Sequence, residues 1–284
     1  MLAIGDPVYG RWAANMAMSI KYHSDTPVLL VREKTATSTI HAHHLQLFDE
    51  IIEIDPEDCR DGTRLNPAKA KLNLYKYLPG SALYLDADGI LVTSPDALLK
   101  ECKKALHTQV ERTTGKNDKQ IGWAPLEIVW DKYGLKPKAQ FQEINSSFLW
   151  IKKGKTSSAI FQKALKALED PIPPSQFYQK WGNTNAQPDE LYLSIAMAQS
   201  NHDASLPMTP VYFRPRSAKG PWISMDELQT KYLVLGCWGD ARYNHKSVVH
   251  YYDQLTNRYS QKIIGIRQEF KYHHLIKRKF VRHG

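Results

Sequence analysis

Short strand-like segments alternate with helical segments through the first third of the chain, and this alternation constrains the fold more than any other feature. Segments typical of strands occur at residues 1–4, 27–31, 48–54 and 82–85. Residues 11–22 and 69–77 predict helices, and in the first of these Trp12, Met16 and Ile20 fall on one face. Strand–helix alternation of this kind builds βαβ units. We therefore expect an α/β fold with a single Rossmann-like, mostly parallel sheet flanked by helices.

The second half of the chain is more mixed. Residues 146–151 predict a strand, residues 157–168 and 188–199 predict helices, and residues 211–213, 232–235 and 247–251 predict short strands. No internal repeat or low-complexity linker interrupts the chain. We expect one domain over residues 1–268 with an α+β C-terminal elaboration, followed by a basic tail over residues 269–284.

Length, cysteine usage and hydropathy narrow the class of protein. The 284 residues fit one large domain with a sizeable core. The three cysteines are far apart and show no CxxC spacing, so they predict neither a disulfide framework nor a zinc site. No run approaches the ~20 apolar residues of a membrane span, and MLAIGDPVYG is too short and too polar for a signal peptide. We expect a cytoplasmic protein without a transmembrane span.

The net charge of +9 and the isoelectric point of about 9.2 bear on partners rather than on the fold. No acidic residue follows Glu269, and the tail carries Lys271, Lys277, Arg278, Lys279 and Arg282. One interpretation is a solvated tail. The other is contact with a polyanion, either nucleic acid or an anionic membrane surface touched by residues 271–284.

Two carboxylates interrupt an apolar run in ALYLDADGILV. Asp86 and Asp88 are two positions apart, so in extended backbone their side chains point to the same side. Carboxylates held this close repel each other unless a cation lies beside them, and hard oxygen ligands suit Mg²⁺ or Mn²⁺. The alternative is a turn in which the aspartates cap loop amides. No P-loop and no GxGxxG motif occurs in the chain.

LYLDADGILV resembles the DxD segment of GT-A glycosyltransferases, and it is most similar to the retaining group typified by glycogenin and the bacterial lipopolysaccharide galactosyltransferases. VVHY, at residues 248–251, resembles the late strand whose histidine completes the metal site of that group. The resemblance therefore implies a Mn²⁺ or Mg²⁺ ion held by Asp86, Asp88 and His250.

Further segments resemble the donor site of this family, in the family's order along the chain. AIGDPVY resembles the first-strand loop that holds the nucleotide base, which implies that Asp6 and Tyr9 bind the base and that Ile4 contacts the nucleotide. A lysine upstream of the DxD strand matches Lys71 or Lys69, and we favour Lys71. Ala87, inside the DxD segment, is also implied to contact the nucleotide.

The donor sugar is implied to lie against two later segments. Asn145 begins an Asn-Ser-Ser segment that resembles the family's Asn-Ser-Gly, with Ser147 in place of the glycine. Asp189 matches the aspartate of the family's Asp-Gln segment, and Glu190 stands where the family has glutamine. The Lys-Pro-Trp that follows the late histidine is absent, so the pyrophosphate-binding lysine has no direct counterpart. Lys246, Arg242 or Arg258 could substitute for it.

The resemblance implies a metal-dependent glycosyltransferase that moves a sugar from a nucleotide-sugar, with UDP as the expected nucleotide, to an acceptor hydroxyl with retention. For the acceptor we favour a hydroxylated base in DNA, as in some phage enzymes, over a membrane-borne glycan such as lipopolysaccharide. Two alternatives stay open. One is a GT-A-like nucleotidyltransferase, and the other is a non-catalytic module that binds sugar nucleotides.

Overall fold

The computed structural model describes residues 1–38, 40, 42–116, 118, 124–172, 188–206, 212–213 and 224–236. The predicted strand at 247–251, with His250, and the basic tail at 269–284 lie outside the described residues. No helix in the described ranges is long and apolar enough to cross a membrane.

A parallel sheet forms the N-terminal part, as the sequence predicts. Strand β1 (Leu2–Ala3) pairs with β2 (Leu29–Arg32), which pairs with β3 (Glu50–Glu53). Helix α1 (Pro7–His23) connects the first two strands and packs against β1. It begins earlier than predicted because Asp6 caps it and Pro7 occupies the first turn, where a missing N–H costs nothing.

The remaining described strands pair mostly in the antiparallel sense. Strand β6 (Ala82–Leu85) pairs with β9 (Phe141–Ile151), which pairs with β8 (Leu106–Thr114). Strand β7 (Gly89–Leu91) pairs antiparallel with β11 (Val234–Gly236), and β11 pairs parallel with β10 (Tyr212–Phe213). The elements are those of an α/β fold, as predicted, and parallel pairing is confined among the described strands to β1–β2–β3 and β10–β11.

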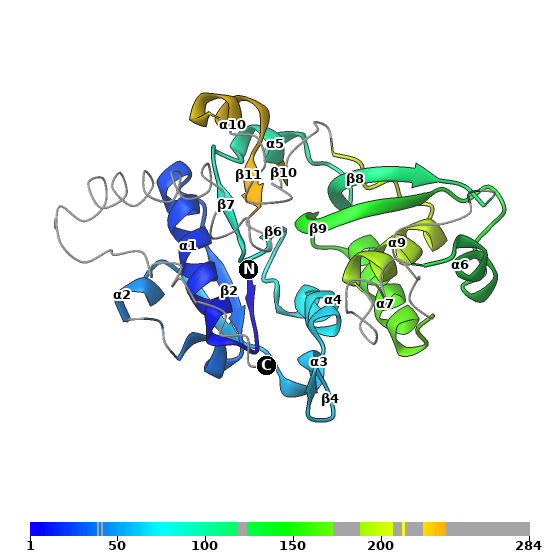
Figure 1. The fold of residues 1–284 in the computed structure, drawn as a ribbon, viewed down its shortest axis with the longest axis horizontal. Coiled ribbons are helices and arrows are strands. Elements are labelled where there is room, and N and C mark those ends of the chain that lie inside the picture. Colours follow the sequence, from blue (N-terminus) through cyan, green and yellow to red (C-terminus); the bar gives the residue numbers. More distant parts are fainter. Residues whose placement is uncertain are drawn as a thin grey trace, which may run out of the picture.

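Three helices cover the β9 side of the molecule. Helices α4 (Pro67–Tyr77), α7 (Lys155–Glu169) and α9 (Asp189–Gln199) contact one another, and α9 packs on β9 (Figure 1). Most of α9 is buried, including Tyr192 and Ile195, because its sequence is apolar on nearly every face. The first turn of α9 is thereby held against the central strands.

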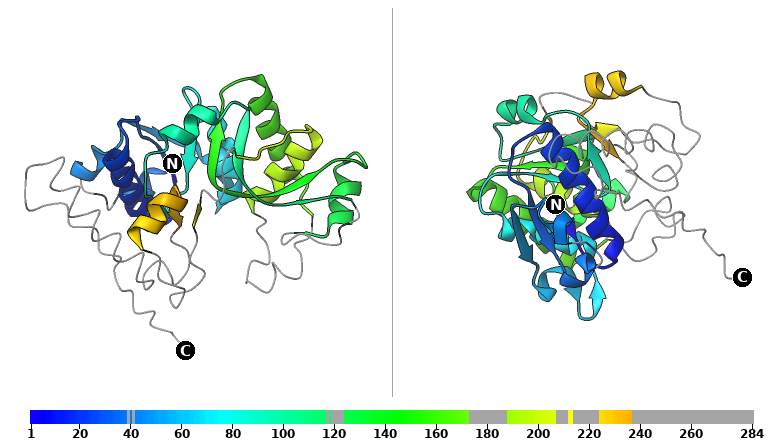
Figure 2. Two further views of the ribbon diagram at one scale, coloured as in Figure 1. Left: turned by 90° about the horizontal axis from the view of Figure 1, so that it is seen from above. Right: turned by 90° about the vertical axis from the view of Figure 1, so that its left-hand side faces the viewer.

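Shorter elements complete the described fold (Figure 2). The 3₁₀ helix η1 and a β-hairpin lie in the N-terminal part, and further short helices connect the strands. Their bounds are η1 (Lys34–Thr37), α2 (Ala42–Leu45), α3 (Pro56–Cys59), β4 (Arg60–Asp61), β5 (Arg64–Leu65), α5 (Asp96–Glu101), α6 (Leu126–Lys132) and α10 (Met225–Lys231). Figure 1 shows α1, α2 and β2 on one side, β8, β9, α6, α7 and α9 on the other, and β6, β7 and β11 between them.

Candidate functional site

The acidic turn joins β6 to β7. Strand β6 ends at Leu85 and β7 begins at Gly89, so Asp86 and Asp88 lie in the connection, both half-buried. Ala87 between them is buried in one cluster with Ala3 and Ala13, which places the turn beside β1 and α1. A Cβ at Gly89 would lie 2.9 Å from Met16 Cε on α1, so the glycine permits this close approach.

Lys71 of α4 points at the first aspartate of the turn. Its Nζ lies 3.0 Å from Asp86 Oδ1 and donates a hydrogen bond of 2.9 Å to Ser146 Oγ on β9. The hydroxyl of Tyr84 donates to the same Asp86 Oδ1 at 2.5 Å. Burial would raise the pKa of Asp86, but the Lys71 charge and the Tyr84 hydrogen bond outweigh burial and hold that pKa below its usual value. Asp86 therefore stays ionised in this arrangement.

Asp189 contributes a second carboxylate to the same lysine. It occupies the first turn of α9, and its Oδ2 lies 3.3 Å from Lys71 Nζ. The side chains of Lys71 and Asp189 are only 10% and 14% exposed, so one buried ammonium serves two nearly buried carboxylates. Burial would lower the pKa of Lys71, but Asp189 and Asp86 together raise it well above its usual value. Asp189 Oδ2 accepts no hydrogen bond from the described residues.

Glu190 follows Asp189 on the same helical turn and is half-buried. Burial, and then the neighbouring charge of Asp189, raise the pKa of Glu190 to about 7. The two carboxyl groups at the start of α9 therefore differ in environment, because Asp189 has a cation at contact distance.

The segment Asn145–Ser147 of β9 runs beside the acidic turn. The backbone N–H of Asp86 donates to the carbonyl oxygen of Ser147 at 3.0 Å, and Asn145 Oδ1 accepts the backbone N–H of Ser147 at 3.0 Å. Asn145 and Ser147 are buried. Lys71, Asp86, Ser146 and Asp189, which come from four separate segments of the chain, thus meet in one cluster, and Asn145 is the strand neighbour of Ser146.

The loop after β1 presents the other predicted residues. Ile4 is buried, whereas Asp6 is exposed and accepts the backbone N–H of Val8 at 2.8 Å as the N-cap of α1. Tyr9 is 43% exposed and is the one large hydrophobic side chain in the described ranges with that much exposure. Its ring stands edge-on to Trp12, with centroids 5.1 Å apart. An aromatic side chain with this exposure suits stacking on a ligand ring.

Comparison with solved structures identifies the fold. The match to the galactosyltransferase LgtC, which was solved with donor and acceptor sugar analogues, covers 92% of this chain and 95% of LgtC. Its TM-score is 0.51 and the sequence identity is 15%. An active-site Gln-to-Glu mutant of LgtC gives a TM-score of 0.53 and 16% identity over 90% of this chain and 95% of that one. The bifunctional glycosyltransferase WbbM gives 0.57 and 10% identity over 91% of this chain, which spans only 49% of WbbM. The fold is the GT-A glycosyltransferase fold. No protein-family model matches the sequence, and no curated protein matches it.

Within this GT-A fold, the donor groups at the acidic turn fit a hard cation. Asp86 and Asp88 supply carboxylate oxygens, which Mg²⁺ and Mn²⁺ prefer. No three histidine, cysteine, aspartate or glutamate side chains of the described residues gather into a metal-binding group. The third predicted ligand, His250, lies outside those residues. Two carboxylates suit an ion that keeps open positions for phosphate oxygens and water.

Two members of the charged cluster, Tyr84 and Ser146, were not predicted as site residues, although Ser146 stands in the predicted Asn-Ser-Ser segment. Tyr84 is two positions before Asp86, so strand alternation places both on one face, and that signal was available. Ser146 receives the Lys71 hydrogen bond across 75 positions of sequence, which no local pattern reveals. Lys71 contacts Asp86, whereas Lys69 Nζ donates to the Arg60 carbonyl at 2.8 Å.

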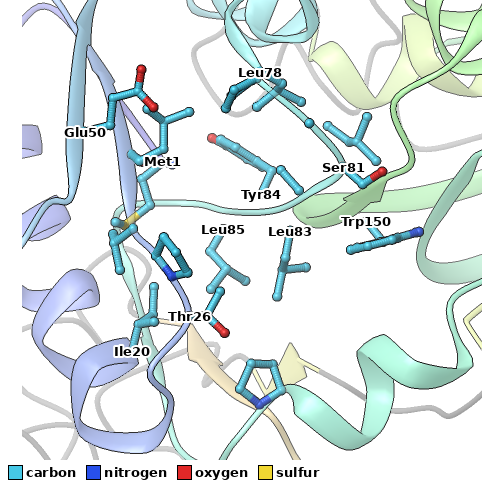
Figure 3. A pocket seen from close by; sticks show the side chains of 18 of the residues that line it. Met1, Ile20, Thr26, Glu50, Leu78, Ser81, Leu83, Tyr84, Leu85 and Trp150 are labelled. Carbon is cyan, nitrogen blue, oxygen red and sulfur yellow. Dashed lines mark hydrogen bonds between the residues drawn. The ribbon is translucent and has the colours of Figure 1, made fainter.

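An apolar cavity of about 420 Å³ borders the charged cluster at Tyr84, which is one of its lining residues (Figure 3). It separates the amino end of β2 from β6 and is lined by Met1, Leu29, Leu83, Leu85 and Trp150, among others. Asp86 and Asp189 do not line it. The cavity supplies few polar groups, so the charged cluster is the better candidate for chemistry.

Proposed function

We propose that the chain is a metal-dependent glycosyltransferase that takes a sugar from a nucleotide-sugar, with UDP as the nucleotide. The observation that supports the proposal is the convergence of Asp86 and Asp189 on the buried Lys71 ammonium, with Ser146 as a further partner. The resemblance selected Lys71, Asp86, Asp189 and the Asn145–Ser147 segment from separate parts of the chain. A GT-A fold alone would not require that convergence.

The nucleotide would lie between the loop after β1 and the acidic turn. Tyr9 would stack on the base and Asp6 would accept a base N–H through the oxygen that does not cap α1. Ile4 and Ala87 are buried, so their backbone groups are the parts that would contact the nucleotide. The cluster that holds Ala87 against Ala3 supports this placement, because it joins the two segments.

Asp86, Asp88 and His250 would hold the Mn²⁺ or Mg²⁺ ion. When bound, such an ion supplies Lewis-acid stabilisation of the charge on a departing diphosphate. Lys71 keeps Asp86 ionised and so keeps a ligand oxygen available to the ion.

The donor sugar would be held by Asp189, Glu190 and Asn145. The acceptor hydroxyl would attack the anomeric carbon, and the resemblance implies retention. Glu190 replaces the family's glutamine, and a carboxylate can act as a nucleophile where an amide does so poorly. A Gln-to-Glu mutant was also made in the active site of LgtC. Glu190 is the position of this chain to test for retention.

For the acceptor, the comparison favours a glycan, because LgtC was solved with an acceptor sugar analogue. A hydroxylated base in DNA is the second candidate, and the net charge of +9 is the observation in its favour. Binding to DNA through phosphate contacts should weaken steeply with salt. A mobility shift that is absent, or that does not respond to salt, would leave the glycan as the acceptor.

The test is a hydrolysis assay across nucleotide-sugars with Mn²⁺ and no acceptor. We expect release of the nucleoside diphosphate from one donor, with loss of activity in EDTA and in Asp88→Ala. The control is Asp25→Ala, which removes an exposed carboxylate that follows α1 and is not part of the acidic turn. Full turnover by Asp88→Ala, or in excess EDTA, would contradict the metal mechanism. Release of pyrophosphate would indicate a nucleotidyltransferase, and nucleotide binding without turnover would indicate a binding module.

A further inference from the structure

A buried carboxylate lies behind the loop after β1. Glu33 follows β2, and its side chain is only 12% exposed. Its Oε2 accepts the backbone N–H of Gly5 at 2.6 Å, and its own backbone N–H donates to the carbonyl oxygen of Ala3 at 3.0 Å. Glu33 therefore fixes the chain on both sides of Ile4.

Gly5 makes the turn that Glu33 holds. Its φ is +73°, a conformation that side-chain-bearing residues rarely adopt, and an added Cβ would lie 2.7 Å from Leu65 Cδ2. Asp6 comes next and caps α1, and Tyr9 lies in the first turn of that helix. The direction in which Asp6 and Tyr9 leave the sheet thus depends on the Gly5 peptide.

Arg60 holds the other oxygen of Glu33. Its Nη2 and Nε donate to Glu33 Oε1 at 2.6 and 3.0 Å, and its Nη1 donates to the Thr63 carbonyl at 2.9 Å. Burial would raise the pKa of Glu33, but the Gly5 hydrogen bond and Arg60 outweigh burial and keep that pKa below its usual value. Each oxygen of the ionised carboxylate therefore has its own donor, and charge-assisted bonds of this kind are the stronger ones.

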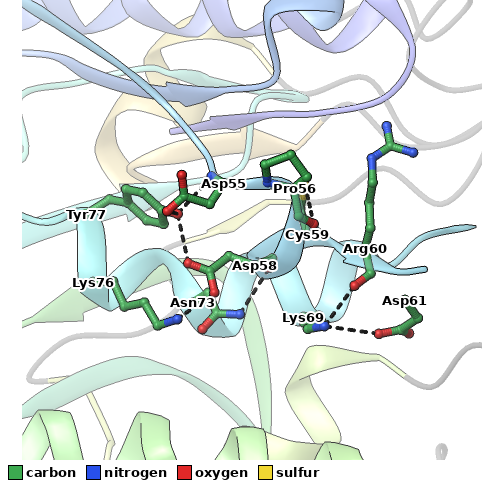
Figure 4. Close-up of polar contacts among 10 residues, drawn as sticks. All are labelled: Asp55, Pro56, Asp58, Cys59, Arg60, Asp61, Lys69, Asn73, Lys76 and Tyr77. Carbon is green, nitrogen blue, oxygen red and sulfur yellow. Dashed lines mark hydrogen bonds and ion pairs between the residues drawn. The ribbon is translucent and has the colours of Figure 1, made fainter. Parts of the chain in front are cut away.

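Helix α4 anchors Arg60 in turn (Figure 4). Lys69 Nζ donates to the Arg60 carbonyl at 2.8 Å. Asp58 on α3 accepts the Tyr77 hydroxyl at 2.8 Å, and Asn73 Nδ2 donates to the Asp58 carbonyl at 3.0 Å. These bonds clamp α3 on the same helix that carries Lys71.

We propose that Glu33 is a positioning residue for nucleotide binding, which acts by holding the Gly5 turn and is itself held by Arg60. The role rests on the proposed function. Glu33 need not touch the ligand, because it acts through the backbone that carries Asp6 and Tyr9. Loss of its charge should weaken binding of the nucleotide more than it slows turnover at saturating donor.

The test compares Glu33→Gln with Asp49→Asn in the full-length protein. Asp49 is the control, because it also accepts a backbone N–H, from Val28 at 2.6 Å, and pairs with a cation, Lys21 at 2.5 Å. It lies at the amino end of β3, whereas Glu33 follows the carboxyl end of β2. The Asp49 side chain is 48% exposed against 12% for Glu33, so the stability lost in Asp49→Asn should be the smaller of the two.

Two readouts separate positioning from stability. Titration calorimetry with UDP and Mn²⁺ should show about tenfold weaker binding for Glu33→Gln, the equivalent of one hydrogen bond to a charged group, and an unchanged affinity for Asp49→Asn. Hydrogen exchange should be faster in the peptide over residues 4–11 of Glu33→Gln only. Arg60→Lys keeps the positive charge but loses the paired guanidinium donors. Its UDP affinity should therefore fall between those of wild type and Glu33→Gln.

Equal UDP affinity and equal exchange in Glu33→Gln and wild type would overturn this inference and leave the proposed function intact. A matching loss of affinity in Asp49→Asn would also overturn it, because the effect would then be one of stability. Wild-type protein that binds no nucleotide would overturn the proposed function and the positioning role with it.

Discussion

Replacement of Lys71 by methionine should destabilise the fold strongly. Methionine has a similar length but no charge, so Asp86 and Asp189 would lose the ammonium at 3.0 and 3.3 Å and stay in place. Removal of one partner from a buried ion pair costs about 3–5 kcal/mol. Asp86 is 23% exposed, so water screens part of its charge and we expect about 3 kcal/mol. At about 2–4 °C per kcal/mol, the thermal midpoint should fall by roughly 6–12 °C.

The loss of stability in Lys71→Met should depend on pH. The pKa of Asp86 is lowered in the folded state, so the stability that Lys71 confers is present above the unfolded aspartate pKa of about 3.9 and is lost as the pH falls through the folded value. In Lys71→Met the cause of that lowering is gone, and the carboxyl groups protonate at higher pH. The gap between wild type and variant should therefore be widest near pH 7 and narrower at pH 5.

Circular dichroism melts in EDTA at both pH values would measure the gap. The control is Lys231→Met, which breaks an exposed pair with Glu227 at side-chain exposures of 58% and 43% and should change stability by less than about 0.5 kcal/mol. Lys71→Met combined with Asp189→Asn should recover part of the loss, because one stranded charge is removed. A midpoint equal to that of Lys231→Met, or a gap that does not narrow at pH 5, would refute the reasoning.

Three further outcomes test other parts of the site. Tyr9→Ala should leave the thermal midpoint nearly unchanged, because the ring is 43% exposed, yet weaken UDP binding by about 1–3 kcal/mol in calorimetry. Gly89→Ala should cost about 1–3 kcal/mol in urea unfolding, because its Cβ would meet Met16 Cε at 2.9 Å and Val234 Cγ1 at 3.1 Å. The raised pKa of Glu190 means that wild type loses stability as the pH rises from about 4.3 to about 7. The thermal midpoint of Glu190→Gln should therefore rise relative to that of wild type as the pH increases over that range. A difference in midpoint that stays constant with pH would contradict the pKa shift.

Local sequence signals explain which parts of the fold could be predicted. Strand β6 has the predicted bounds, because ALYL is a continuous apolar run that ends at a charge. Strand β8 was not predicted, because LHTQVERTT is polar and its middle is partly exposed, so neither alternation nor an apolar run marks it. Its length comes from pairing with β9, which is a tertiary contact.

In the candidate site, too, some features follow from local sequence and others only from packing. Lys69 and Lys71 are equivalent in the local sequence, but a helix turns about 200° over two residues, so they serve different faces of α4. Lys71 faces Asp86, and Lys69 faces Arg60. Only the packed structure tells which lysine belongs to the charged cluster.

Helix α4 therefore joins the two halves of the proposed donor site. One of its faces holds the acidic turn through Lys71, and another holds Arg60, whose guanidinium reaches Glu33 and hence the Gly5 turn. The Glu33 contacts to Gly5 and Arg60 span 28 and 27 positions, so no local pattern announces them. A change that shifts α4 as a rigid element should consequently disturb both the base-binding loop and the acidic turn, whereas Glu33→Gln should disturb the loop alone.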